Sequence, residues 1–193
     1  PVPYAGSYVM APLAINLAGS DDQKNQWLPK IAGGECVIGV GLSEYVGARE
    51  DAGIEFSNGK LSGRCLFLID GKNADAYLLA NKSGELFLVE ASAPGIEVIE
   101  LTTVDKTRTS IELILKNVDA DLLSGSDNRS IIEKVLDAGR IMLAADTVGA
   151  AQVMLDKSVA YSLERKQFGR LIGSFQAVKH MCAEMAAELE PCH

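Results

Sequence analysis

The segment ERKQFGRLIGSFQAVKH, residues 164–180, holds the side chains best suited to ligand chemistry. Arg165 and Lys166 come directly before the amide of Gln167 and the ring of Phe168. A guanidinium group pairs with phosphate or carboxylate oxygens through two parallel hydrogen bonds, so a local basic patch of this kind can hold a small anion. The alternative is a connection between two helices whose charges are simply solvated.

The composition of the 193 residues argues against several other kinds of site. The formal net charge is -8, which is unlike a general nucleic-acid binder. Four cysteines lie far apart without a CxxC pair and there are only two histidines, so we expect no metal site and reduced, packing cysteines in a cytoplasmic protein. We also expect no membrane span, because no apolar run approaches ~20 residues, and the N-terminus lacks the order of a signal peptide.

Three kinds of hydrophobic pattern follow one another along the chain. Both ends look cut, so we expect part of a larger protein. Residues 7–33 show helical spacing of apolar side chains such as Met10, Ala14 and Leu17. Residues 35–125 hold seven short apolar or alternating segments separated by turn signals, which predicts an antiparallel β-barrel or sandwich.

Helical periodicity returns from Ser126 and runs without proline to about Arg165. A second helix follows, with Met181 and Met185 on the side predicted to face inward, as in a helical bundle. The predicted fold is therefore α+β with several domains. These are the end of an N-terminal helical domain at 1–34, a middle β-domain at 35–125, and the start of a truncated C-terminal helical bundle at 126–193.

These segments resemble the flavin-dependent acyl-CoA dehydrogenases over nearly the whole chain. The anchors, in the family's order and spacing, are GSDDQKNQWLPKIAGGE, VGLSE, LSGRCLFLIDGKNADAYLLA, LILKNVDADLL, LDAGR and ERKQFGRLIGSFQAVKH. The last motif is long and specific. The resemblance implies an acyl-CoA dehydrogenase-like fold with FAD held between the β-domain and the C-terminal bundle.

The resemblance also implies the contacts to cofactor and substrate. Positions matching the corner that meets the FAD of a neighbouring subunit, at its pyrophosphate–adenine end, are Arg165, Gln167, Phe168, Ile172, Phe175 and Gln176. Matching cofactor positions in the β-domain are Leu42, Ser43, Arg49, Phe67, Leu68 and Ile69. Asp137 and Arg140 match positions along the bound coenzyme A thioester, although an i,i+3 pair of this kind also suits a plain surface ion pair.

Two stretches of the β-domain depart from the family pattern. Where the family has T-E-P-x-x-G-S-D, with a hydroxyl and backbone amides on the flavin ring and pyrophosphate, residues 43–50 read SEYVGARE. Ser43 keeps the hydroxyl, and Arg49 would serve a phosphate by charge. Where the family has W-I-T-N, this chain reads FLID, in which Phe67 can still pack but Ile69 has no hydroxyl to donate to the flavin's reactive edge.

No residue of the chain matches the family's catalytic base. In the family a glutamate removes the proton α to the thioester carbonyl while hydride leaves the β carbon for the flavin. In most members that glutamate lies far beyond the position of Arg165, past the end of this sequence. In a minority it directly precedes the position of Arg140, which here is Gly139.

The resemblance thus implies an FAD-dependent acyl-CoA dehydrogenase that forms an α,β double bond in an acyl-CoA thioester and passes electrons to an electron-transfer flavoprotein. It would work in a homomeric or heteromeric dimer or tetramer, in the cytoplasm or, in a eukaryote, the mitochondrial matrix. The alternative favoured by the departures is a non-catalytic partner subunit of a heteromeric dehydrogenase that braces its neighbour's FAD. A flavin-dependent monooxygenase or oxidase on the same fold is a third interpretation.

Overall fold

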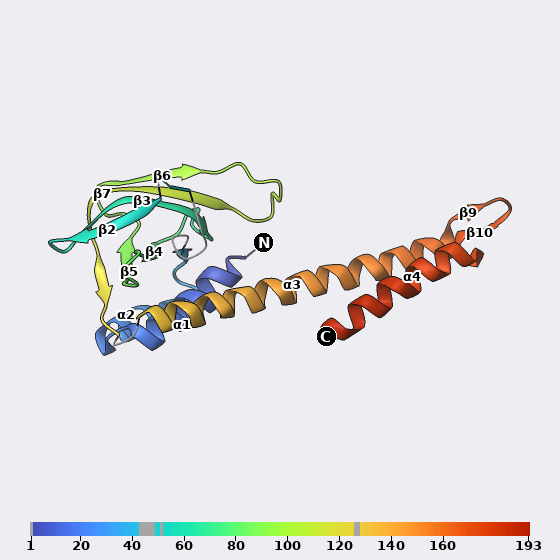
Figure 1. Ribbon diagram of the computed structural model, residues 1–193, viewed down its shortest axis with the longest axis horizontal. Coiled ribbons are helices and arrows are strands. Elements are labelled where there is room, and N and C mark those ends of the chain that lie inside the picture. The colour runs from blue at the N-terminus through green and yellow to red at the C-terminus, as the bar shows by residue number, and fades with distance from the viewer. Residues whose placement is uncertain (1, 43–48, 51, 126–127) are drawn as a thin grey trace. The chain divides into compact units, whose positions relative to one another are not determined.

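The computed structural model describes residues 2–42, 49–50, 52–125 and 128–193. They divide into two compact units, Pro1–Gly139 and Arg140–His193, and Figure 1 traces the chain through both. The division falls inside helix α3 (Asn128–Glu164), which contributes to each unit. The domain limits expected from the sequence, near residues 34 and 125, stay predictions.

The first unit begins with three consecutive helical segments, η1 (Tyr4–Met10), α1 (Ala11–Ala18) and α2 (Asp21–Ala32). A capping box starts α2: the backbone N–H of Gln23 donates to Ser20 Oγ at 3.2 Å, and the backbone N–H of Ser20 donates to Gln23 Oε1 at 2.9 Å. Ile15 and Ala18 turn toward the core, which leaves Leu17, expected on the apolar face, 40% exposed.

The described residues of the first unit form a sheet of eight strands. Figure 1 shows this sheet. The strands are β1 (Ile38–Gly41), β2 (Gly53–Ser57), β3 (Lys60–Ile69), β4 (Ala76–Ala80), β5 (Leu86–Glu90), β6 (Ile96–Glu100), β7 (Ser110–Asp119) and β8 (Asp121–Leu123). The order is β6-β7-β3-β1-β4-β5-β8, with β2 paired to β3 beside this path. Among the described strands β1 and β4 are parallel, with Ile38 opposite Ala76, and the other pairs of the sheet are antiparallel as expected.

The turn signals of the sequence lie where the chain reverses. Asn58 (φ 51°) and Gly59 (φ 78°) join β2 to β3, with Ser57 directly opposite Lys60. A two-residue hairpin loop of type I′ needs positive φ at both central positions, which asparagine and glycine tolerate best. This turn fixes the register of β3, the strand that carries several candidate site residues.

Strands β1, β4 and β5 are buried on both faces. Leu78 and Ala80 pack in one core with the helices, whereas Tyr77 and Leu79 pack in a second core enclosed by the sheet. Ile132 and Val135, in the first turns of α3, belong to the helix-covered core. The alternation explains the continuous apolar run of β4, since each face of a strand takes every second residue.

The second unit is a helical hairpin with a short β-ribbon at its tip (Figure 1). After α3 come β9 (Lys166–Gln167), β10 (Arg170–Leu171), η3 (Ile172–Ser174), α4 (Gln176–Leu189) and η4 (Glu190–Cys192). Gly173 lies against α3, where a Cβ would come within 2.9 Å of the Ser162 carbonyl oxygen. No residue of α4 is buried, and Met181 and Met185, predicted to face inward, are 54% and 40% exposed. The described residues therefore leave the apolar side of α4 largely uncovered.

The predicted fold class is confirmed, and among the described strands the parallel β1–β4 pair departs from an antiparallel sheet. No helix among the described residues is both long and apolar enough to cross a membrane.

Candidate functional site

The corner between α3 and α4 is a tight two-stranded ribbon. Gln167 pairs with Arg170 across it, and the two-residue turn between them holds Phe168 and Gly169 at φ 53° and 78°. A positive φ is strained for a bulky aromatic residue, at a cost of about 1–3 kcal/mol. The turn leaves the Phe168 side chain 93% exposed. An aromatic ring held outward by a strained backbone is a typical contact for a ligand or another chain.

Three side chains of the corner stack on one another. The rings of Phe168 and Phe175 meet edge to face with centroids 6.2 Å apart, and the guanidinium carbon of Arg170 lies 3.9 Å above the Phe175 ring. Such a cation–π contact orients the ring and is worth roughly 0.5–1 kcal/mol at an exposed site. Sequence reasoning missed Arg170, although its position three residues after Gln167 is the spacing of a two-residue hairpin.

The backbone of the corner is anchored while its polar side chains stay exposed. The N–H of Arg165 donates to Tyr161 O at 2.9 Å, and the N–H of Ile172 donates to Arg165 O at 2.8 Å. The side chains of Arg165, Gln167 and Gln176 are exposed, and Ile172 is half-buried. The six residues predicted to contact a cofactor in this unit therefore lie within one corner.

In the first unit, a β-bulge in β3 projects Phe67 outward. Cys65 pairs with Leu113 and Leu68 with Ile111, so Leu66 and Phe67 together oppose the single residue Glu112 of β7. Phe67 has φ 53° and is 51% exposed. The bulge thus directs this ring out of the sheet, as a contact with a planar ligand requires.

The neighbouring predicted positions differ in what they offer a ligand. Leu42 and Leu68 are buried in the two cores, so only their backbone groups remain for a ligand. Ile69 is half-buried beside η1, where a Cβ on Gly6 would lie 3.3 Å from its Cγ1. Ser43 lies outside the described residues.

Arg49 pairs with an acidic side chain of the sheet. Its Nη2 lies 3.3 Å from Oε1 and 3.5 Å from Oε2 of Glu112, and Arg64 Nη1 lies 2.9 Å from the same Oε1. The Glu112 side chain is only 6% exposed, whereas that of Arg49 is 51% exposed. No sequence signal joins these residues, because β3 and β7 are brought together by long-range pairing.

Asp70, next to Ile69, connects β3 to the N-terminal segment. Its Oδ2 accepts the backbone N–H of Gly6 at 2.7 Å, and burial raises the pKa of the carboxyl although hydrogen bonds from Gly6 and Ser7 oppose the shift. Ser7 Oγ accepts the N–H of Ile38 at 2.9 Å. These contacts fix η1 against the start of β1 and against the end of β3 that carries the flavin-ring positions expected from the sequence.

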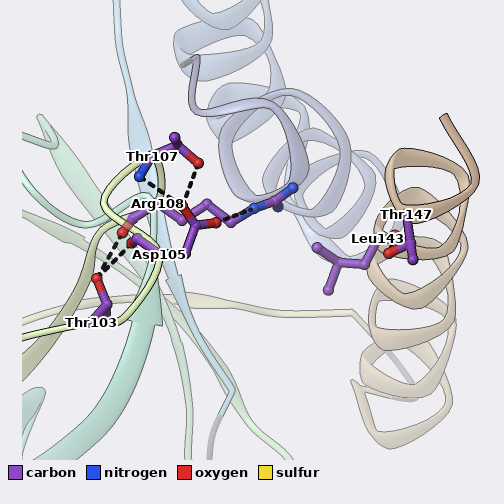
Figure 2. A network of polar contacts seen from close by, with 6 residues as sticks. All are labelled: Thr103, Asp105, Thr107, Arg108, Leu143 and Thr147. Carbon is purple, nitrogen blue, oxygen red and sulfur yellow. Dashed lines mark hydrogen bonds and ion pairs between the residues drawn. The ribbon is translucent and has the colours of Figure 1, made fainter. Parts of the chain in front are cut away.

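A polar loop between β6 and β7 is organised around Asp105 (Figure 2). Its Oδ1 accepts the N–H of Thr107 at 2.8 Å and the Thr107 hydroxyl at 2.7 Å, and Arg108 Nε lies 3.6 Å from Oδ2. These donors lower the pKa of Asp105. Figure 2 also shows the Thr147 hydroxyl donating to Leu143 O, within α3, at 2.8 Å.

Asp137 and Arg140, the predicted thioester contacts, lie on α3 and are exposed. Gly139 between them is buried. A Cβ at Gly139 would lie 2.7 Å from Met10 Sδ and 3.1 Å from its Cε. The position that carries the base in a minority of the resembled family therefore lies directly against the side chain of Met10.

The fold and the site positions described above indicate one class of protein, the acyl-CoA dehydrogenases. Comparison with known proteins gives the same class. Residues 129–192 match the family model described as acyl-CoA dehydrogenase, C-terminal domain. The chain is 30% identical over 208 residues to a probable acyl-CoA dehydrogenase of Bacillus subtilis, YngJ, covering 97% of this chain and 55% of that protein. It is 28% identical over 198 residues to the caffeyl-CoA reductase-Etf complex subunit CarC of Acetobacterium woodii, covering 90% and 51%.

Among solved structures, a glutaryl-CoA dehydrogenase from Mycobacterium smegmatis in complex with FADH2 superimposes with a TM-score of 0.85. Its identity is 25%, and the match covers 99% of this chain and 53% of that one. The chain belongs to the acyl-CoA dehydrogenase family, and it spans about half the length of the curated relatives it matches.

Proposed function

We propose that this chain is part of an FAD-dependent acyl-CoA dehydrogenase that introduces an α,β double bond into an acyl-CoA thioester. The observation that carries the proposal is the corner at 165–176. It presents an exposed arginine and an exposed phenylalanine on an anchored backbone, which suits the phosphate and adenine groups of a dinucleotide. When bound, FAD accepts the hydride that leaves the β carbon of the substrate.

The residues present fit two separate contacts with FAD. In the first unit, Phe67 would pack on the flavin ring, the backbone of Leu42 and Leu68 would donate or accept hydrogen bonds, and Arg49 would meet the diphosphate. In the second unit, the corner around Phe168 would contact the FAD of a neighbouring subunit. We therefore infer an obligate dimer or a dimer of dimers.

The substrate and the electron acceptor follow from the same proposal. Asp137 and Arg140 would lie along the coenzyme A thioester, since both are exposed on α3. The electrons would pass to an electron-transfer flavoprotein, as the name of the related Etf-complex subunit suggests. The base that removes the α proton would come from sequence outside this chain, because position 139 holds a glycine, which has no carboxylate. The proposed location is the cytoplasm, or the mitochondrial matrix in a eukaryote.

The absorbance spectrum of the full-length protein tests the proposal. We expect bands of oxidised flavin that bleach anaerobically when a matching acyl-CoA thioester is added, with formation of the enoyl-CoA product. Coenzyme A without an acyl group is the control and should leave the bands in place. Absence of flavin both alone and with co-expressed neighbours would contradict the proposal.

A second candidate function is a non-catalytic partner subunit that braces the FAD of its neighbour. Two departures from the family pattern favour it: Ile69 has no hydroxyl to donate to the flavin, and residues 43–50 read SEYVGARE. This function predicts a colourless protein when purified alone and a yellow complex when it is co-expressed with a second dehydrogenase chain. A yellow protein that turns over substrate by itself would exclude it.

A further inference from the structure

The turn that follows β3 is packed closely on three sides. A Cβ at Gly6 of η1 would lie 3.3 Å from Ile69 Cγ1. A Cβ at Gly39 of β1 would lie 2.7 Å from Gly71 Cα, and one at Gly71 itself would lie 2.6 Å from Ile111 Cδ1 of β7. Glycine permits approaches this close, so the turn is held in place by η1, β1 and β7.

Asp70 lies in this turn, and its carboxylate contacts η1. The Oδ2 atom accepts the backbone N–H of Gly6 at 2.7 Å, and the N–H of Ser7 donates a further hydrogen bond. Burial raises the pKa of the carboxyl, these two donors oppose the shift, and the charge of Arg108 has the smallest effect of the four. The carboxylate is therefore held mainly by neutral N–H groups, and when ionised it keeps a net negative charge in the turn.

The place of this charge in the chain relates it to the flavin contacts expected from the resemblance. Ile69 matches the threonine of the family's W-I-T-N stretch, which borders the flavin ring, and Asp70 matches the asparagine that follows. This chain thus differs from the family pattern by one negative charge, at the residue next to the expected ring position. An asparagine oxygen would accept the same N–H from Gly6, so the hydrogen bond alone does not require a carboxylate.

We propose that the Asp70 carboxylate lowers the reduction potential of the FAD bound by this chain. Reduction adds negative charge to the flavin ring, so a fixed carboxylate near the ring disfavours the reduced form relative to the oxidised form. Burial of the turn strengthens the effect, because charges interact more strongly where water is excluded. The inference rests on the proposed function, and it adds a residue that the resemblance does not assign to the cofactor. Its consequence is a flavin that gives up electrons more readily to its acceptor.

The test compares how tightly the full-length protein binds oxidised and reduced FAD. Fluorescence titration of the apoprotein gives the dissociation constant of oxidised FAD. The midpoint potential against a reference dye then gives the constant of reduced FAD, measured at about pH 8, well above the ordinary aspartate pKa of about 3.9. In Asp70→Asn we expect the affinity for reduced FAD to rise by about tenfold relative to that for oxidised FAD, which corresponds to a potential about 30 mV higher for a two-electron couple.

Asp119→Asn is the matched control, since it removes the same charge from the other end of the same pair of strands. Asp119 lies opposite Lys60, whereas Ile69 lies opposite Ser110. The two ends are about 30 Å apart at roughly 3.3 Å per residue, so this variant should leave the potential unchanged. If Asp70→Asn does not fold, Asp70→Ser carries the same expectation, because its hydroxyl is neutral and can also accept an N–H.

Three results overturn the inference while the proposed function stands. An unchanged ratio of the two affinities, including an equal loss of both, would mean that Asp70 only stabilises the turn. A lower potential in Asp70→Asn would give the charge the opposite effect. An equal rise in Asp119→Asn would mean that net charge, and not this carboxylate, acts on the flavin. A wild-type protein that binds no FAD, alone or in complex, would remove both the inference and the proposed function.

Discussion

Gly139 of α3 lies against Met10 of η1, so closely that a Cβ at position 139 would come within 2.7 Å of the methionine sulfur. Met10 is 6% exposed and belongs to the core shared by the helices and the sheet. The contact brings α3 down onto η1 at the point where a minority of the resembled family would place a catalytic glutamate. In this chain the position holds a glycine, and a larger side chain there would require the Met10 side chain to shift.

Introducing a carboxylate at this position should damage the fold without creating activity. We expect Gly139→Glu to lower the free energy of unfolding by about 3 kcal/mol, through overpacking and burial of a charge. Gly149→Ala is the control on the same helix, since nothing lies within 4 Å of its Cβ position, and it should stabilise by about 1 kcal/mol. Urea unfolding measures both. Unaltered stability of Gly139→Glu, or a gain of dehydrogenase activity, would contradict this account of the position.

The stability contributed by Asp70 should depend on pH with a sign opposite to that of most acidic residues. Burial raises its pKa, so the folded protein holds the proton more tightly than the unfolded chain does. Its contribution is therefore greatest at low pH and falls as pH rises from about 3.9, the ordinary aspartate value, through the raised folded value. Asp70→Asn keeps an oxygen for the Gly6 N–H and should remove this dependence, which unfolding measured from about pH 4 to about pH 7 will detect.

Asp105 provides the opposite control. Hydrogen bonds from Thr107 lower its pKa, so its contribution is present at neutral pH and is lost as pH falls through the folded value. Asp105→Asn should therefore reduce the loss of unfolding free energy that the protein shows as the pH falls into the acidic range. If both asparagine variants shift the profile in the same direction, burial is not what sets the Asp70 pKa.

Arg165→Ala should lower the FAD content of the assembled protein, because it removes a cation from the exposed corner that the proposal places on the diphosphate of a neighbouring FAD. We expect an affinity loss of about 1.5–3 kcal/mol, or roughly tenfold or more, measured as flavin per protein after dialysis. Lys179→Ala, an exposed cation on α4, is the matched control and should retain flavin. Full flavin occupancy of Arg165→Ala would refute the role of this residue.

Ile69→Thr tests whether the chain has a working flavin pocket of its own. The added hydroxyl should donate to the flavin edge and strengthen flavin retention by about 1 kcal/mol, seen as slower release of the cofactor. Ile69→Val keeps the branched shape without the hydroxyl and serves as the control. An identical release rate for the two variants would favour the partner-subunit function.

Much of this architecture follows from local sequence signals. The hairpin turns at Asn58-Gly59, the capping box at Ser20, and the helical period of α3 are each encoded by residues close together in the chain. The resemblance added the positions of the corner at 165–176, which the structure gathers into one anchored ribbon. Contacts to FAD at those positions stay predictions.

The remainder depends on long-range pairing that no local signal records. The bulge at Phe67 and the contacts of Glu112 arise from the register between β3 and β7, and the parallel pairing of β1 with β4 from the topology of the sheet. Met181 and Met185 follow a clear apolar period, yet no described residue buries them. Periodicity indicates which face is apolar but not what covers it.

The parallel pairing of β1 with β4 has a consequence for how the first unit refolds. The hairpins β2–β3, β4–β5 and β6–β7 close over short loops and can form within microseconds. Ile38 must instead find Ala76 across the intervening β2–β3 hairpin, at a far higher contact order. The pairing of β3 with β7 also joins distant segments, since Lys60 lies opposite Asp119. We therefore expect these two long-range searches, and not hairpin formation, to set the refolding rate.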